Sequence, residues 1–293
     1  MAVTVESVAG TQCTLGEGVL WDHTRGVVWF VDIKNHRLWQ LNPENGETRS
    51  WQAPGQIGWV VPSEGGLLLA GLQDGLYSFD PEASVFTHLT AVPGEPEGNR
   101  LNDAATHPSG AVYFGSMDDG EEALSGRFYR WLDGEITAAG PDEICITNGP
   151  ATSPDGGLIY YTDTAAQKIF VAEIGADGLP GEAKLFADTG LLFPEAWPDG
   201  PVVDSQGCVW TGLWNGWAVA RFSPSGELLE KVDIPAGNVT KMAFGGPDLQ
   251  TVYVTTARKG LSDEELARQP LAGNLFAFRA DVAGAHVTPV RLG

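Results

Sequence analysis

The chain has 293 residues and a formal net charge of −21, from 38 acidic and 17 basic side chains. A surface of this sign repels phosphate backbones and anionic lipids, so nucleic acid and membrane surfaces are excluded as expected partners. The 38 glycines, 19 prolines and 10 tryptophans predict many short strands joined by tight turns.

The N-terminal stretch MAVTVESVAG has neither the basic region nor the apolar region of a signal peptide. No apolar run in the sequence approaches the roughly 20 residues that a membrane helix needs. Cys13, Cys145 and Cys208 are widely spaced and form no CxxC pair, which is typical of reduced thiols. We therefore expect a cytoplasmic protein.

Six apolar or aromatic strands, each following a turn, recur along the chain. They read GVVWFVDI, GLLLAGLQ, GAVYFGSM, GLIYYTDT, GCVWTGLW and TVYVTTAR, starting at Gly26, Gly66, Gly110, Gly157, Gly207 and Thr251. A second short strand follows each one, with the sequences HRLWQLNP, DGLYSFDP, GRFYRWLD, QKIFVAEI, WAVARFSP and GNLFAFRA. The interval of roughly 40–50 residues is typical of four-stranded propeller blades.

The fold prediction is therefore all-β, a single six-bladed β-propeller domain over residues 1–293 with a central metal site. We expect the end strands TVESVA and HVTPVRL to pair and close the ring, which removes exposed sheet edges. A closed ring has no edge that must be paired, so we expect a monomer. One helix is predicted in LSDEELARQ, where Ser262 and Glu265 form a capping box, as a short surface insertion in the last blade.

Polar residues recur at one position of the segment that precedes each turn. These segments are predicted to be the innermost strands, so one rung of side chains would converge from different blades at one mouth of the channel. The rung comprises Gly58, Asn102, Asn148 and Asp199, each eight residues before a turn glycine, Glu17, nine residues before Gly26, and Thr240 or Lys241 in the sixth segment.

Asn148-Gly149 resembles a hairpin turn, but Pro154-Asp155-Gly156 is a second turn signal only a few residues later. No strand fits between two turns so close together. We therefore place the hairpin turn at 154–156. Asn148 then begins an inner strand with its carboxamide facing the axis, and Gly149 allows the backbones to approach.

Two carboxylates and two carboxamides on one rung offer oxygen ligands. Such donors suit Ca²⁺, Mg²⁺, Mn²⁺ or Fe²⁺ rather than soft metals. Two like charges held close together are costly unless a positive charge lies between them. The alternative is that these polar groups only hold water in the channel.

Motifs of other enzyme classes are missing from the sequence: it has no GxSxG, HExxH, P-loop or GxGxxG. Most tryptophans are predicted to fill the blades. Trp59, Trp197 and Trp214 fall close to the predicted channel mouth, where they could face a sugar.

Several motifs, in order from about residue 13 to the C-terminus, resemble the gluconolactonase/regucalcin (senescence marker protein) family. They are LGEGVLWD, NRLNDAATHPSGAVYFGSM, ITNGPATSPDGGLIYYTDT, PDGPVVDSQGCVW and NVTKMAFGGPDLQTVYVTTAR. ICITNGP and ARKGLSDEELARQPLAGNLFAF resemble bacterial pentonolactonases such as xylonolactonase. The resemblance implies a six-bladed propeller with one divalent metal in the channel.

The resemblance also implies roles for single residues. Glu17, Asn148 and Asp199 match the metal ligands of the family, and Arg100 and Asn102 match its substrate-binding residues. The family's acidic substrate contact is assigned to Glu121. The stretch GSMDDGEEALSG leaves this contact open among Asp118, Asp119, Glu121 and Glu122.

The expected activity is metal-dependent hydrolysis of a sugar lactone, such as the pentonolactone xylonolactone, to the aldonic acid. Asp199 takes the proton of the attacking water or only orients that water, and Arg100 donates hydrogen bonds to the substrate. The divalent metal is left open among Ca²⁺, Fe²⁺, Mn²⁺, Zn²⁺ and Mg²⁺. Two other functions also remain open: an ester or organophosphate hydrolase on the same site, and a non-catalytic, metal-binding regulatory propeller.

Overall fold

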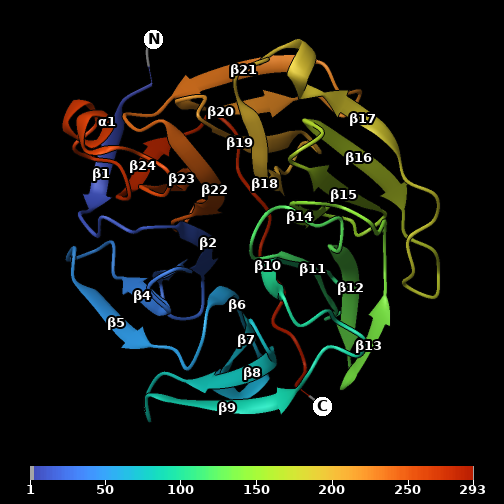
Figure 1. Ribbon diagram of the computed structural model, residues 1–293. Coiled ribbons are helices and arrows are strands. Elements are labelled where there is room, and N and C mark those ends of the chain that lie inside the picture. Colours follow the sequence, from blue (N-terminus) through green and yellow to red (C-terminus); the bar gives the residue numbers. More distant parts are fainter. Residues whose placement is uncertain (1–2, 293) are drawn as a thin grey trace.

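The computed structural model describes residues 3–292. They form six four-stranded antiparallel sheets, arranged as blades around a central axis (Figure 1). The predicted all-β, six-bladed propeller is therefore confirmed. The innermost strands of successive blades contact one another, and that of the sixth blade contacts that of the first.

Each blade runs from its innermost to its outermost strand. Blade 1 comprises β2 (Gly16–Asp22), β3 (Val27–Asp32), β4 (Arg37–Leu41) and β5 (Thr48–Gln52). Blade 2 comprises β6 (Ile57–Pro62), β7 (Leu68–Leu72), β8 (Gly75–Asp80) and β9 (Val85–Thr90), with the 3-10 turn η1 (Glu64–Gly66) between its first two strands. Blade 3 comprises β10 (Asn99–Thr106), β11 (Val112–Asp118), β12 (Arg127–Leu132) and β13 (Glu135–Ala138).

The second half of the ring repeats this order. Blade 4 comprises β14 (Thr147–Thr152), β15 (Leu158–Asp163), β16 (Lys168–Glu173) and β17 (Lys184–Asp188), and the 3-10 turn η2 (Thr189–Leu191) follows it. Blade 5 comprises β18 (Trp197–Val203), β19 (Val209–Trp214), β20 (Ala218–Phe222) and β21 (Leu228–Asp233). Blade 6 comprises β22 (Asn238–Gly245), β23 (Thr251–Ala257), β24 (Leu275–Arg279) and β1 (Val5–Ala9).

The ring is closed by β1 alone, so the predicted pairing of the two end strands is wrong. β1 lies antiparallel to β24, with Val5 opposite Phe278, and it occupies the outer edge of blade 6. The C-terminal segment instead crosses the ring towards blade 2 (Figure 1), where the N–H of Val290 donates to the carbonyl of Pro62 at 2.9 Å. Pro289 has no N–H, which disfavours a longer ladder in this segment.

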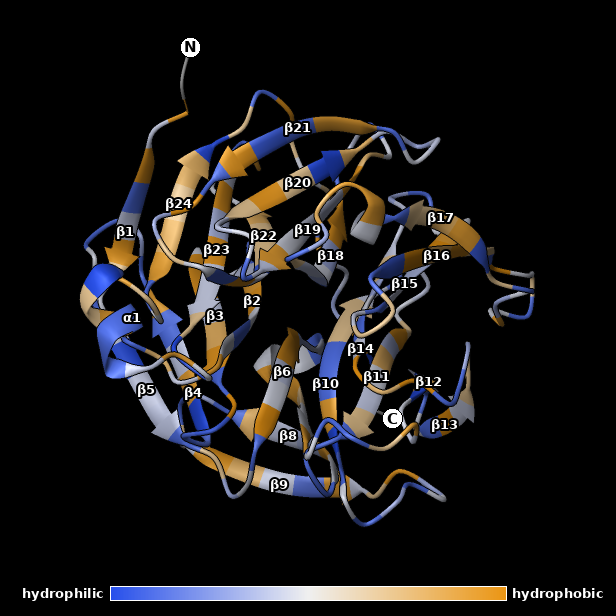
Figure 2. Ribbon diagram, turned by 45° about the horizontal axis from the view of Figure 1, so that its top comes forward, coloured by the Kyte–Doolittle hydropathy of each residue, from blue (hydrophilic) through white to orange (hydrophobic). Residues whose placement is uncertain are grey.

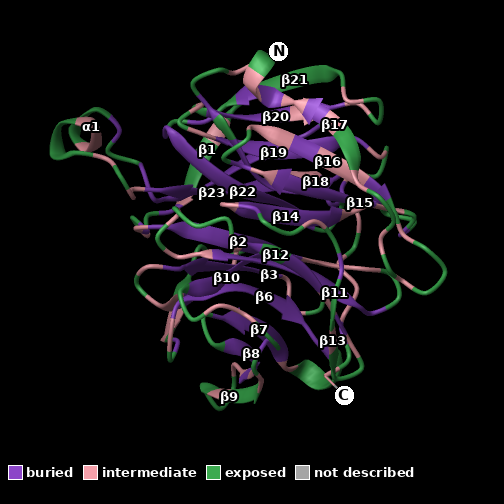
Figure 3. Ribbon diagram, turned by 45° about the vertical axis from the view of Figure 1, so that its right-hand side comes forward, coloured by how far each residue is buried: buried purple, intermediate pink, exposed green. Residues whose placement is uncertain are grey.

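Burial falls from the axis to the rim, as Figure 3 shows. Every residue of β2, β6 and β22 is buried, whereas β5, β9 and β21 are mostly exposed or half-buried. The inner strands are covered on both faces by neighbouring blades, so they carry apolar side chains on both faces. Trp29 and Trp210 are among the largest fully buried side chains.

The helix α1 (Asp263–Arg268) begins at the predicted capping box. The Ser262 hydroxyl accepts from the N–H of Glu265 at 3.3 Å, and the Glu265 carboxylate accepts from the N–H of Ser262 at 2.8 Å. The helix has no buried residue and is mostly hydrophilic in Figure 2. It is the predicted surface insertion. Across residues 3–292, the structure contains no helix with the length and apolar character of a membrane span.

Each inner strand is interrupted by a β-bulge at the rung that the sequence singles out. The register shifts lie between Glu17 and Leu20, Ile57 and Trp59, Leu101 and Ala104, Asn148 and Ala151, Pro198 and Pro201, and Val239 and Met242. A bulge leaves one residue unpaired and re-aims its neighbours. Six bulges at one level therefore turn polar side chains into the channel without ending the strands.

Among the rung residues named above, Gly58 is the one without a polar side chain. Its neighbours explain why. A Cβ atom there would lie 2.5 Å from the carbonyl oxygen of Leu101 and 2.7 Å from that of Asn102. We expect Gly58→Ala to lower the free energy of unfolding by about 1–3 kcal/mol, as overpacking does, measured by urea denaturation. Gly55→Ala is the matched control, because no atom lies within 4 Å of its added Cβ. Equal stability of the two variants would contradict this account.

Candidate functional site

All six predicted site residues line one pocket of about 370 Å³ at the channel mouth. They are Glu17, Arg100, Asn102, Glu121, Asn148 and Asp199. Trp197 and Trp214 also line it, as expected for tryptophans that could face a sugar. Trp59 does not: it is buried in the core, with its ring centroid 5.7 Å from that of Phe114.

The amide of Asn148 is held with its oxygen towards the pocket residues. The hydroxyl of Thr164 donates to the carbonyl of Pro198 at 2.8 Å, so it can only accept from the Asn148 amide nitrogen, which lies at 3.0 Å. Asn148 Oδ1 then accepts from Asn102 Nδ2 at 3.1 Å. Gly149 adopts a positive φ of 75°, and a Cβ there would lie 2.9 Å from Pro201, which agrees with the predicted close approach of inner strands.

Glu17 and Asp199 face each other as buried carboxylates. Burial raises the pKa of Glu17 well above its usual value, and the charge of Asp199 adds to this. Burial, followed by the charge of Asp103, raises the pKa of Asp199 to about 8. Opposite charge favours the ionised form, so a cation between the two carboxylates would lower both pKa values again.

A buried ion pair below this rung was not assigned from the sequence. Lys241 Nζ lies 2.6 Å from Asp103 Oδ1 and 2.7 Å from Oδ2, with side-chain exposures of 9% and 1%. Asp103 Oδ2 also accepts from the N–H of Gly149 at 2.9 Å. The pair joins blades 3 and 6 across the channel. The sequence placed Thr240 or Lys241 near the rung, but only the structure distinguishes them: Thr240 donates its hydroxyl to the carbonyl of Gly16 at 2.6 Å.

The donor set fits a divalent cation. When ionised, Glu17, Asp103 and Asp199 carry three negative charges and Lys241 carries one positive charge, which leaves a net charge of −2 for these four interacting side chains. Within residues 3–292, no three His, Cys, Asp or Glu side chains form a metal site by themselves. The third donor here is the amide of Asn148, and two carboxylates with an amide oxygen form a set of hard ligands.

Arg100 is buried behind one wall of the pocket. Its Nε donates to Asp119 Oδ1 at 2.9 Å, and its Nη1 donates to Asn102 Oδ1 at 2.5 Å. In the described part of the chain no hydrogen bond uses its Nη2. Burial lowers the pKa of Arg100, and the charges of Asp119 and Glu121 offset this in part. The guanidinium therefore keeps one donor group for a ligand.

Asn102 is more constrained than a free substrate contact. Its amide hydrogens serve Asn148 Oδ1 and the carbonyl of Thr147, at 3.1 and 2.6 Å, and its oxygen accepts from Arg100. It links Arg100 to Asn148, so it orients both.

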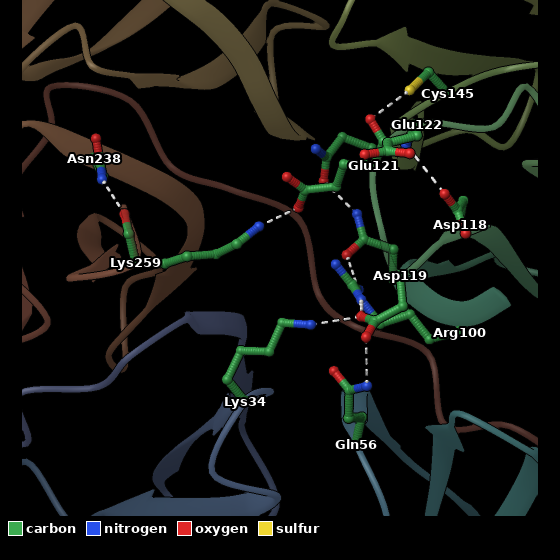
Figure 4. Close-up of polar contacts among 12 residues, drawn as sticks. Lys34, Gln56, Arg100, Asp118, Asp119, Glu121, Glu122, Cys145, Asn238 and Lys259 are labelled. Carbon is green, nitrogen blue, oxygen red and sulfur yellow. Dashed lines mark hydrogen bonds and ion pairs between the residues drawn. The ribbon is translucent and has the colours of Figure 1, made fainter. Parts of the chain in front are cut away.

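Among the four acidic residues at and just after the end of β11, only Glu121 lines the pocket. Asp118 accepts from the backbone N–H groups of Glu122 and Ala123, at 3.0 and 3.1 Å. Asp119 is held by three donors, which Figure 4 shows around it: Lys34, Gln56 and Arg100.

Glu121 itself pairs with Lys259, which also lines the pocket. The backbone of Glu121 has a positive φ of 61°, and its carbonyl accepts from Cys145 Sγ at 3.3 Å. Lys259 was not singled out from the sequence. Lys259 lies in the loop after β23, where no periodic pattern of polar and apolar residues distinguishes it.

The chain matches a known family over most of its length. Residues 15–258 match the family described as SMP-30/Gluconolactonase/LRE-like region. The chain belongs to this family. The resemblance stated from the motifs is thereby confirmed.

Curated relatives and solved structures cover nearly the whole chain. A 6-deoxy-6-sulfogluconolactonase of Pseudomonas putida is 33% identical over 97% of each chain. An L-arabinolactonase of Azospirillum brasilense is 36% identical over 94% of this chain and 92% of the relative. The crystal structure of a calcium-binding protein, regucalcin, from Agrobacterium tumefaciens has a TM-score of 0.93 and 29% identity, covering 99% of this chain and 98% of that one.

Proposed function

We propose that the protein is a metal-dependent lactonase that hydrolyses a sugar lactone, of the pentonolactone class that includes xylonolactone, to the aldonic acid. The observation that carries the proposal is the convergence of Glu17, Asn148 and Asp199 in one pocket that also holds Arg100. The names of the two relatives, a sulfogluconolactonase and an arabinolactonase, support the same reaction class.

In this proposal Glu17, Asn148 and Asp199 would hold one divalent cation. When bound, such a cation polarises the lactone carbonyl and stabilises the charge that develops on its oxygen. Asn148 would be kept in place for this by Thr164 and Asn102, because supporting hydrogen bonds orient metal ligands.

Arg100 would donate from Nη2 to an oxygen of the lactone. Trp197 and Trp214 would cover the apolar face of the ring. Together these contacts would hold the carbonyl carbon near Asp199, whose carboxylate removes a proton from the attacking water or orients it. The water oxygen bonds to the carbonyl carbon, the ring ester C–O bond breaks, and the proton ends on the released hydroxyl group.

We propose that the described ring acts as one lactonase domain, as a monomer, on a small-molecule substrate. The cysteines Cys13, Cys145 and Cys208 are free, in keeping with the expected cytoplasmic location. Hard oxygen donors bind several divalent ions. An experiment must therefore determine which of Ca²⁺, Fe²⁺, Mn²⁺, Zn²⁺ and Mg²⁺ supports the activity.

One observation favours a second candidate, a metal-binding regulatory propeller without catalysis: the regucalcin of similar fold is described as a calcium-binding protein. An ester or organophosphate hydrolase would use the same cation and base. The pocket favours the sugar lactone over both, because Arg100 and Glu121 supply a donor and an acceptor for hydroxyl groups beside the cation site.

The test measures the hydrolysis of xylono-, arabino-, galactono- and gluconolactone through the acid that it releases. The measurement is made before and after a chelator removes the metal. We expect the metal-free protein to lose at least about 90% of its turnover, because loss of a Lewis acid removes several kcal/mol of transition-state stabilisation. Resupply of one ion at a time should restore turnover. Aryl esters and an organophosphate serve as competing substrates. Cation binding with no hydrolysis of any lactone would reject the lactonase in favour of the regulatory propeller.

A further inference from the structure

An ion pair joins two residues that line the pocket of the proposed cation ligands. Glu121 follows β11 of blade 3, and Lys259 follows β23 of blade 6. These blades lie opposite each other in the ring, because the contacts between inner strands run in chain order around it. Figure 4 shows the two side chains meeting from opposite sides. Asp199 lines the same pocket, so a ligand that fills this pocket contacts the pair.

The backbones of both residues are anchored while their side chains remain accessible. The N–H of Lys259 donates to the carbonyl of Thr14 at 2.8 Å, and its carbonyl accepts from Asn238 Nδ2 at 3.0 Å. The N–H of Glu121 donates to the carbonyl of Asp118 at 3.1 Å. The two side chains are 28% and 32% exposed. Water therefore reaches both side chains and screens their attraction in part, so a ligand that supplies hydrogen bonds can separate the pair.

The other two basic side chains near the mouth each have an acidic partner other than Glu121, and in the described chain Arg100 keeps only its Nη2 for a ligand. Lys34 and Arg100 both donate to Asp119, and Lys34 does not line the pocket. In the described residues, the only hydrogen bond of the Lys259 ammonium is to Glu121. Lys259 and Glu121 therefore form a separable donor and acceptor at the entrance.

We propose that Lys259 is a substrate-contacting residue that selects for hydroxylated rings together with Glu121, an inference that rests on the proposed lactonase function. The ammonium donates to the oxygen of one ring hydroxyl, and the Glu121 carboxylate accepts the hydrogen of the neighbouring hydroxyl. A vicinal diol therefore gives each of the two charged side chains a hydrogen-bond partner in place of the other side chain. A lactone without hydroxyls would also separate the pair, but it offers no hydrogen bond to either charged group, so it binds poorly.

The first arm of the test measures binding without hydrolysis. 1,4-Anhydroxylitol carries the ring and the hydroxyls of a pentonolactone but has no carbonyl. We expect Lys259→Met to weaken its binding about tenfold, the scale of a hydrogen bond to a charged group, in an NMR titration of the metal-loaded protein. Lys259→Arg keeps the charge and should restore much of the affinity. Lys231→Met is the control, because Lys231 forms an exposed ion pair on the outer strand β21.

The second arm compares xylono-1,4-lactone with γ-butyrolactone, which has the same ring without hydroxyls. Lys259→Met should raise KM for the first about tenfold, with kcat within about twofold. It should not lower kcat/KM for the second, because the variant has no ion pair for this lactone to separate. Binding of anhydroxylitol as tight as in the wild type, or an equal loss on both lactones, would overturn the proposal. If the wild type hydrolyses no lactone, the proposed function fails, and the binding arm still decides the role of Lys259.

Discussion

Asp199→Asn is expected to lower turnover of a sugar lactone by about 10²–10⁴-fold, because loss of a general base removes that much rate. The fold should survive the change. Asp199 Oδ1 accepts from the N–H of Gly200 at 2.8 Å, and an asparagine oxygen can accept the same bond. The measurement is kcat at a saturating concentration of the divalent cation, with circular dichroism as the check of folding.

Saturation with cation separates two roles of this carboxylate. Asp199 is proposed both to hold the cation and to act on the water, whereas Glu17 is proposed only to hold it. Glu17→Gln should therefore recover much more turnover than Asp199→Asn when the cation is in excess. The control is Asp233→Asn, which should keep wild-type turnover. Asp233 lies on the exposed outer strand β21 of blade 5, the blade that also contains Asp199. Full recovery of Asp199→Asn by excess cation would remove Asp199 from the chemical step.

Lys241→Met is expected to lower the free energy of unfolding by about 3–5 kcal/mol, the usual cost of removing one partner of a buried ion pair. Without the ammonium, the Asp103 carboxylate stays buried close to Glu17 and Asp199, whose pKa values its charge already raises. Methionine keeps the approximate length of the side chain, so the effect reports mainly on charge. The measurement is urea denaturation in the presence of a chelator.

A divalent cation should recover part of this loss. The variant site carries one more negative charge than the wild type, so saturating cation should stabilise it more than it stabilises the wild type. The double variant Asp103→Asn/Lys241→Met removes both charges and should be more stable than Lys241→Met alone. Lys231→Met breaks an exposed pair and should change stability by about 0–1 kcal/mol. A Lys241→Met variant as stable as Lys231→Met would show that the pair below the rung contributes nothing.

Local signals were sufficient for the repeat and for most of the rung. The second strand of each blade is buried along most of its length and mainly apolar. Six such strands therefore stand out from the polar turns between them. Counting back from the turn before each of these strands leads into the innermost strand, which is how Glu17, Asn148 and Asp199 could be found. The capping box of α1 is equally local.

Three features depend on contacts between distant segments; the sequence analysis misplaced the first two and left the third open among four residues. β24 has one open edge, and whether β1 or the C-terminal segment takes it depends on where the two ends of the chain reach. Trp59 was placed near the mouth, but its ring is buried in the core against Phe114, a residue of the next blade. Glu121 lines the pocket, whereas Asp118 and Asp119 are held by donors from other segments or from the backbone.

The sequence by itself determined the number of blades, the apolar strand that each blade repeats and the level at which polar groups meet. These follow from periodicity, and periodicity is written along the chain. Only the tertiary structure decided which charges face each other across the channel, as Asp103 does with Lys241 and Glu121 with Lys259. Each of these pairs joins residues 138 positions apart, and no local pattern reports a distance that the closing of the ring creates.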